Sequence, residues 1–349
     1  MKGNQRIQYL DLLRVFGSFA VVVSHVACQF SGVINVHTKE WMYMNIYIGV
    51  VQWCVPVFVM ISGACLLGRG IELKRILKKN IVHLLIVFLV WSSIYAGIEM
   101  CKESKVGIEF FVSKIIFGHY HMWFLYMLMG LYLIIPILDC IIEHRNVTTL
   151  FLGLGFVFNF VLPWIYMVIG KFSGPLVGAV LSAVANMKMQ LIIGYSFYFV
   201  LGYVLNRIDL SCFPRWILYV LGILGGVATV LLTRYMSYKS GSLNEEYYNF
   251  LTLNVCLQSV AVFVLAKEFT AKSNKFSGRG MTSFLSKCSL GVYLIHPMIL
   301  EYLNGSMKIN ALSFNPAIWI PIFSGILFFV SILFIWLLKR IPIVGDYLV

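Results

Sequence analysis

The side chains best suited to chemistry are an arginine and a histidine inside the first apolar segment, LDLLRVFGSFAVVVSHV. Arg14 and His25 are eleven positions apart. On an α-helix, eleven steps of about 100° bring the second side chain to within roughly 20° of the first, about 16 Å further along the axis. Ionisable groups in a membrane span are costly unless they face protein or water, so this pair predicts the lining of an internal site. The alternative is a snorkelling arginine and a histidine that makes a polar interhelical contact.

The two residue types predict different roles. A histidine can remove a proton as a general base or attack as a nucleophile. An arginine can hold phosphate or carboxylate with two parallel hydrogen bonds. Asp11 lies one turn before Arg14 and is the expected local ion-pair partner.

The composition indicates that these residues lie in a membrane protein. Apolar residues make up 60% of the 349 residues and charged residues 12%, with a mean hydropathy of +0.87, whereas soluble domains carry about 25% charged residues. The sequence therefore predicts an all-α polytopic membrane protein, because its apolar runs have the length of a helical span, about 20 residues. About ten transmembrane helices are expected, at 8–30, 45–67, 81–99, 122–142, 147–170, 190–206, 215–235, 249–267, 284–303 and 316–338.

The positive charges predict the orientation. If the N-terminus is cytoplasmic, most of the 27 lysine and arginine residues fall in inner loops, as the positive-inside rule requires. Ten spans then place both termini in the cytoplasm and the protein in the cytoplasmic (inner) membrane. The net charge of +13 is explained by loops that face anionic membrane lipids, and no nucleic-acid-binding module is visible.

Residues 1–349 are expected to form a single integral-membrane domain without an appended soluble domain, because no linker or low-complexity tract divides the chain. The eight cysteines include no C-x-x-C pair. They predict neither a zinc site nor a disulfide framework.

The inner loop GRGIELKRILKKN is the most charged connection. In the predicted topology it lies on the side of the Arg14 end of the first span. It is either a topology signal with lipid contacts or a phosphate-binding mouth for a nucleotide-like donor. Its cations are Arg69, Lys74, Arg75, Lys78 and Lys79.

Three further motifs stand near span ends: PVFVMISG at 56–63, HMWFLY at 121–126 and YLIHP at 293–297. Their Trp and Tyr residues are also compatible with interfacial anchoring. Ser62 with Gly63 is compatible with close helix packing. His296, before Pro297, is compatible with a polar group at a helix break.

In combination and in this order, the motifs closely resemble the membrane acyltransferase 3 family, which includes bacterial O-acetyltransferases of surface polysaccharides. The resemblance runs from Tyr9 to about Leu300 and is carried by R-x10-H in the first span, VFVMISG, HMWFLYMLMGLYLIIPIL, YFVLGYVLNR and SLGVYLIHPMIL. It implies a ten-helix acyltransferase unit of the stand-alone type. The implied donor substrate is acyl-coenzyme A, such as acetyl-CoA, with no permanently bound cofactor.

The resemblance also implies roles for single residues. His25 corresponds to the catalytic histidine and Arg14 to its essential companion. The family's Ser-Gly pair falls on Ser62 and Gly63, and its Trp-Phe-Leu begins at Trp123. Its Tyr-Leu-x-His-Pro motif places Tyr293 and His296 in the site.

One departure concerns the donor site. Many members carry R-x-x-R at the entry to the third span, whereas this chain has Asn80 and His83 there. Arg75, Lys78 and Lys79 are near enough in sequence to supply the charge, but a lysine offers a point charge rather than an arginine fork.

The expected activity is transfer of an acetyl or other short acyl group from acyl-CoA at the cytoplasmic side to a hydroxyl of a cell-surface or lipid-linked glycan. A transporter or polysaccharide flippase is the alternative, because the same polar stripe would suit a translocation path.

Overall fold

The computed structural model describes residues 8–102, 107–169, 193–272, 279–341 and 345, and these contain helices and no strand. Within these described ranges, eight helices are long and apolar enough to cross a membrane, or nine if one bent pair is a single span. The predicted all-α polytopic class is therefore confirmed. The α-helices are α1 (Gln8–Cys28), α2 (Lys39–Val51), α3 (Cys54–Leu66), α4 (Leu73–Arg75), α5 (Val82–Lys102), α6 (Ile108–Phe117), α7 (Trp123–Leu133), α8 (Ile135–Glu143), α9 (Arg145–Gly155), α10 (Leu162–Ile169), α13 (Ser196–Arg207), α14 (Cys212–Ser240), α15 (Leu253–Lys272), α16 (Arg279–Ser306) and α17 (Pro316–Leu338).

Three of the ten expected spans differ from this arrangement. The span expected at 190–206 falls partly outside the described residues, and its described helix is α13, 12 residues long. The span expected at 122–142 is broken, because the helical stretch ending at Leu133 and the one beginning at Ile135 are bent by 54°. Pro136 follows the break, and a proline has no N–H to continue the helical ladder.

The third span begins earlier than its apolar run predicts. Helix α4 continues through a π-helix, η1 (Ile76–Ile81), into α5, so Leu73–Lys102 is one candidate span. Lys74, Arg75, Lys78 and Lys79 thus lie on a helix end and not in a loop, which corrects the expected loop at 68–80. Hydropathy does not predict this extension of the helix, because it reports apolar length and not helix continuity.

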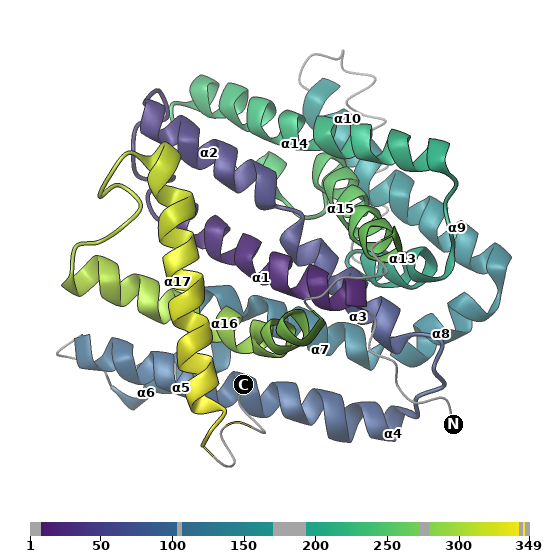
Figure 1. The fold of residues 1–349 in the computed structure, drawn as a ribbon, viewed down its shortest axis with the longest axis horizontal. Coiled ribbons are helices and arrows are strands. Elements are labelled where there is room, and N and C mark those ends of the chain that lie inside the picture. The colour runs from purple at the N-terminus through teal and green to yellow at the C-terminus, as the bar shows by residue number, and fades with distance from the viewer. Residues whose placement is uncertain (1–7, 103–106, 170–192, 273–278, 342–344, 346–349) are drawn as a thin grey trace.

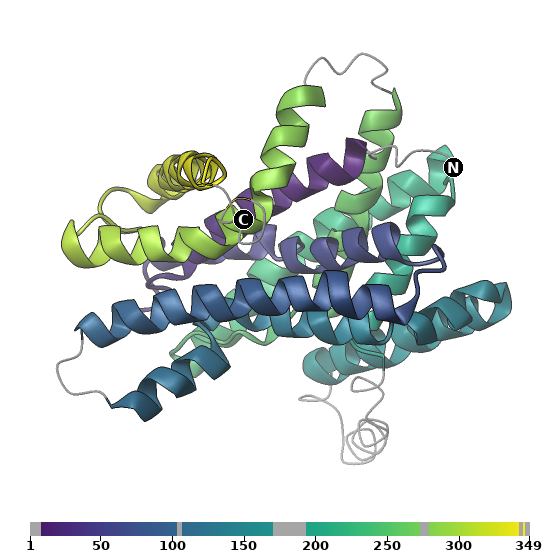
Figure 2. The same cartoon turned by 90° about the horizontal axis from the view of Figure 1, so that it is seen from below.

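Helix α1 lies at the centre of the bundle, shown in purple in Figure 1, and contacts α2, α3, α15, α16 and α17. Figure 2 shows the same molecule from below, with α5 and α6 forming a hairpin on one side. This surrounding explains how the polar groups of α1 avoid lipid: they are enclosed by other helices.

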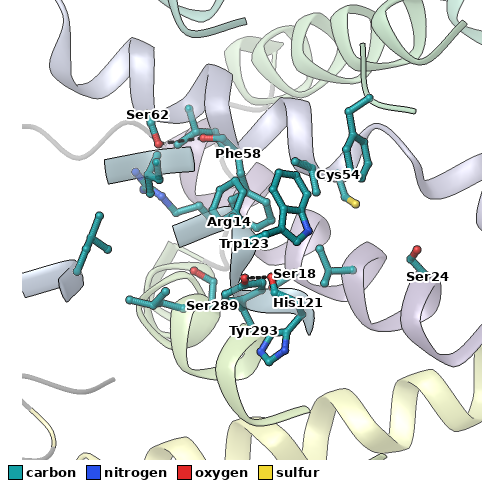
Figure 3. A pocket seen from close by; sticks show the side chains of 18 of the residues that line it. Arg14, Ser18, Ser24, Cys54, Phe58, Ser62, His121, Trp123, Ser289 and Tyr293 are labelled. Carbon is teal, nitrogen blue, oxygen red and sulfur yellow. Dashed lines mark hydrogen bonds between the residues drawn. The ribbon is translucent and has the colours of Figure 1, made fainter. Parts of the chain in front are cut away.

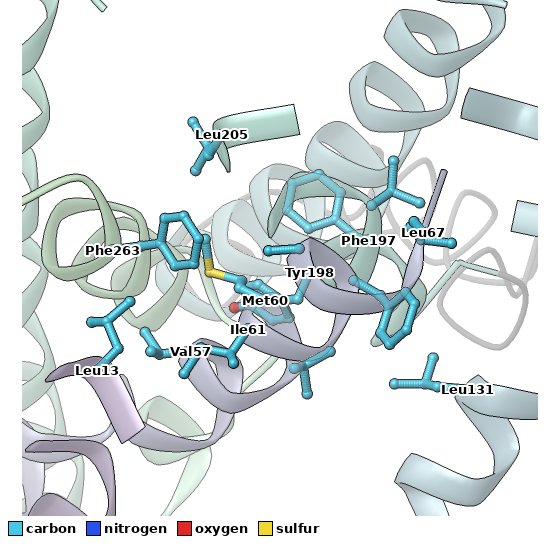
Figure 4. Close-up of a cluster of buried hydrophobic side chains, with 14 of the residues drawn as sticks. Leu13, Val57, Met60, Ile61, Leu67, Leu131, Phe197, Tyr198, Leu205 and Phe263 are labelled. Carbon is cyan, nitrogen blue, oxygen red and sulfur yellow. The ribbon is translucent and has the colours of Figure 1, made fainter. Parts of the chain in front are cut away.

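The largest apolar cluster joins α1, α3 and α13, as the side chains of Leu13, Met60 and Phe197 show in Figure 4. Glycine residues allow α3 and α13 to pack closely against each other. A methyl group added at Gly63 would overlap the backbone of Phe199, and one added at Gly202 would overlap the backbone of Met60. The Ser-Gly motif of α3 therefore includes one residue required by helix packing.

Candidate active site

A cavity of about 310 Å³ runs along α1 and is lined by both Arg14 and His25. Figure 3 shows side chains from several helices pointing into it, including Ser62 from α3, Trp123 from α7 and Tyr293 from α16. The structure thus brings together the two stripe residues and three of the motif residues predicted from the sequence. We call its two ends the Arg14 end and the His25 end.

At the Arg14 end, the guanidinium group is held from two sides. Its Nη1 lies 3.0 Å from Oδ1 of Asp11, and its Nη2 donates to Sγ of Cys65 over 3.3 Å. Asp11 also accepts a hydrogen bond of 2.8 Å from Oγ of Ser286 on α16. Asp11 is buried, whereas the Arg14 side chain keeps 29% of its exposure. Because a guanidinium has five N–H donors, Arg14 can hold these partners and still bind an anion in the cavity.

At the His25 end, two histidines from different helices are in contact. Nδ1 of His25 lies 2.6 Å from Nε2 of His296 on α16, and the two rings stack with centroids 4.8 Å apart. Nδ1 of His296 lies 2.8 Å from the carbonyl oxygen of Val292. His296 is fully buried and His25 is partly exposed to the cavity.

These contacts define the tautomers of the neutral rings. The carbonyl oxygen of Val292 can only accept, so Nδ1 of His296 carries a proton. Nε2 of the same ring is then an acceptor, and Nδ1 of His25 must donate to it. The lone pair of His25 is therefore on Nε2. This is the arrangement in which one side chain orients a neighbouring general base, with His296 as the orienting group and His25 as the candidate base.

His296 lies where the hydrogen-bond ladder of α16 is locally interrupted. Pro297 lies inside this helix, and a proline interrupts the helical hydrogen-bond ladder. The hydroxyl of Tyr95 on α5 bridges the carbonyl of Leu294 and the N–H of Met298, two groups that would bond each other directly in a regular helix. It donates to the carbonyl of Leu294 over 2.7 Å and accepts from the N–H of Met298 at 3.2 Å. Tyr95 thereby anchors the segment that carries His296.

A second pair of histidines borders the same end. Nδ1 of His119 lies 3.0 Å from Nδ1 of His121, and Nε2 of His119 lies 3.0 Å from Oε1 of Glu301. The ring centroid of His121 is 6.2 Å from that of His25. Tyr293 of α16 holds this histidine pair, because its hydroxyl donates to the backbone carbonyl of His121. No group of His, Cys, Asp and Glu side chains within the described ranges is arranged to hold a metal ion.

The remaining predicted residues divide by position. Ser62 lines the cavity, and its hydroxyl donates to the carbonyl of Phe58 at 3.0 Å. His83 is half-buried on α5. The exposed cations Arg69, Arg75, Lys78 and Lys79 do not line the cavity. They lie at the end of the bundle where α1 begins, because α3 runs antiparallel to α1 (Figure 1).

Several residues of the site carried no assignment from the sequence. His121 stands inside the quoted HMWFLY motif, so the motif itself could have assigned it. His119, Glu301 and Phe250 belong to no motif, and they reach the site only through the folding of loops and helix ends. Tyr95 could not be distinguished from an interfacial tyrosine before its contact with α16 was known.

The comparison with protein families agrees with the resemblance of the motifs. A family model described as an acyltransferase domain, that of acyltransferase 3, matches residues 7–338. No curated protein and no solved structure matches the chain. The match covers nearly all of the sequence and includes α1 to α17. The chain therefore belongs to the acyltransferase 3 family.

Proposed function

We propose that this membrane acyltransferase moves an acetyl or other short acyl group from acyl-CoA at the cytoplasmic side to a hydroxyl of a cell-surface or lipid-linked glycan. The observation that carries this proposal is one cavity with an oriented histidine at one end and a partly exposed arginine at the other. Arg14 and His25 are separated by about 16 Å along α1. A donor with an anionic head and a long acyl-bearing arm matches this separation.

The cavity volume sets how the donor can bind. About 310 Å³ is at the lower limit for a drug-sized ligand, so it can enclose the acyl group and part of the arm but not the whole nucleotide. The phosphates then remain at the Arg14 end. There the exposed cations of α4 and η1 supply further donors for them.

The lone pair on Nε2 supports a role for His25 as a general base. The acceptor oxygen attacks the thioester carbonyl carbon while its proton passes to Nε2 of His25. The carbonyl then reforms, the C–S bond breaks, and His25 returns the proton to the leaving thiolate. The products are an O-acyl glycan and free coenzyme A, with no net change at His25. His296 acts as a positioning residue that keeps the lone pair on the nitrogen facing the reactants.

Mass spectrometry of surface glycans tests this function directly. Cells that carry the gene should show glycans heavier by one acyl group, cells without it should not, and a gene encoding His25→Ala should fail to restore the mass increase. Loss of the whole glycan without a change in its acylation would instead indicate transport.

A further inference from the structure

Three aromatic rings from separate parts of the chain form a wall beside the cavity. Trp123 opens α7, Phe250 precedes α15, and Tyr195 precedes α13. The ring of Trp123 is stacked on that of Phe250, with centroids 5.8 Å apart and planes inclined by 23°. The ring centroid of Tyr195 lies 6.1 Å from that of Trp123, with planes inclined by 44°. Trp123 and Phe250 line the same cavity as His25, and Figure 3 shows the indole of Trp123 pointing into it.

The wall is held in place by hydrogen bonds to its backbone. The carbonyl of Phe250 accepts a bond of 2.6 Å from the hydroxyl of Tyr198. Trp123 directly follows the short helix η2 (Tyr120–Met122), in which His121 accepts a bond from Tyr293. These hydrogen bonds fix the backbone that carries Phe250 and the backbone that directly precedes Trp123.

The position of Trp123 distinguishes it from an interfacial anchor. An anchor faces lipid headgroups, as the 64% exposed Trp216 at the start of α14 can. Trp123 instead is 39% exposed and borders the cavity that contains Arg14 and His25. Because ligand pockets are lined mostly by apolar and aromatic side chains, this exposed aromatic surface is suited to binding a ligand.

We propose that Trp123, Phe250 and Tyr195 form an aromatic binding site for a sugar ring of the acceptor, an inference that rests on the proposed function. The C–H groups on one face of a pyranose carry partial positive charge and pack against the negative face of an aromatic ring. The hydroxyls at the edge of the sugar stay free to approach Nε2 of His25. The adenine of the donor would also stack on such rings, but Trp123 directly follows the η2 turn that contains His121, whose ring lies 6.2 Å from that of His25, whereas the anion-binding group is at the Arg14 end.

Kinetics on purified protein test the proposal. The acceptor probe is the surface glycan of the cells that carry the gene, de-O-acylated with mild base, and the donor is radiolabelled acetyl-CoA. Trp123→Ala should raise the half-saturating glycan concentration by roughly tenfold and leave the KM for acetyl-CoA unchanged. Trp123→Phe should recover part of the loss, and the control Trp216→Ala should match wild type. An unchanged glycan dependence in Trp123→Ala, or a shift confined to the KM for acetyl-CoA, overturns the proposal.

A binding measurement separates this proposal from the activity. Saturation-transfer NMR with fragments of the same glycan should show transfer to sugar ring protons in wild type and Trp216→Ala, and much weaker transfer in Trp123→Ala. If wild type acylates no glycan but binds it through Trp123, the proposed function fails and the binding site stands. If transfer is equal in all three proteins, the binding site is refuted whatever the activity.

Discussion

Nδ1 of His25 lies 2.6 Å from Nε2 of His296, a contact between residues 271 positions apart in the sequence. It joins the central helix α1 to α16 next to Pro297, which lies inside α16. The carbonyl oxygen of Val292 binds the other ring nitrogen of His296. The orientation of His25, the proposed base, therefore depends on a helix that is distant from α1 in the sequence.

This dependence predicts a difference between two substitutions of His296. Gln keeps an oxygen that can accept from Nδ1 of His25, whereas Ala removes the acceptor. We expect His296→Ala to lower kcat by about 10²-fold and His296→Gln by only about tenfold, because loss of an orienting partner typically costs 10- to 100-fold. The KM for acetyl-CoA should not change. Equal loss in both variants, measured at equal protein levels, would show that His296 has only a packing role.

At the other end of the cavity, the Arg14→Lys variant separates charge from geometry. Lysine keeps the positive charge but not the planar fork that reaches both Asp11 and Cys65. We expect acyl transfer to fall by at least about tenfold through a higher KM for acetyl-CoA, since a charge-assisted hydrogen bond contributes roughly 1.5–3 kcal/mol. Membrane abundance, measured by immunoblot, should be unchanged. Full activity of the lysine variant would make Arg14 a charge or an anchor only.

The cations on α4 and η1 are expected to contact the donor phosphates. Neutralising Lys74, Arg75, Lys78 and Lys79 one at a time should raise the KM for acetyl-CoA in at least one variant, with little change for the glycan, because a lost charge-assisted bond corresponds to about 10–150-fold in affinity. Orientation should be preserved, as cysteine labelling can check, because many other cations contribute to it.

A gain-of-function variant complements that series. The double substitution Asn80→Arg and His83→Arg restores the cations that many family members carry at these positions, and it should lower the KM for acetyl-CoA. Unchanged donor kinetics in all of these variants would leave the cluster as a topology signal.

Helix packing at the Ser-Gly motif gives a stability prediction with a matched control. In Gly63→Ala the new methyl group would meet the backbone of Phe199, whereas in Gly97→Ala no atom lies within 4 Å. We expect Gly63→Ala to lower the Tm in detergent, since overpacking typically costs about 1–3 kcal/mol. Gly97→Ala should keep or raise the Tm, because alanine is preferred to glycine inside a helix by roughly 1 kcal/mol. Equal Tm values would contradict the close contact between α3 and α13.

Much of this architecture could be predicted from the sequence, because apolar length and helical spacing are local properties. The alignment of Arg14 with His25 and the pairing of Arg14 with Asp11 follow from positions on one helix. The partner of His25 does not, because it depends on how α16 packs against α1. The continuation of the third span through η1 cannot be predicted in this way, since its charged turn lowers the hydropathy there. The aromatic neighbours of Trp123 come from two distant segments, and no spacing rule relates them.

Single-turnover transfer from radiolabelled acetyl-CoA tests the central claim most directly. Wild type, His25→Ala and Ser24→Ala, all purified in the same detergent, should be compared with each protein in excess over labelled acetyl-CoA and with de-O-acylated surface glycan at a saturating concentration. The account predicts that His25→Ala transfers acyl groups about 10²–10⁴-fold more slowly while it still binds acetyl-CoA, and that the neighbouring Ser24→Ala loses far less. Near-wild-type transfer by folded His25→Ala would contradict it.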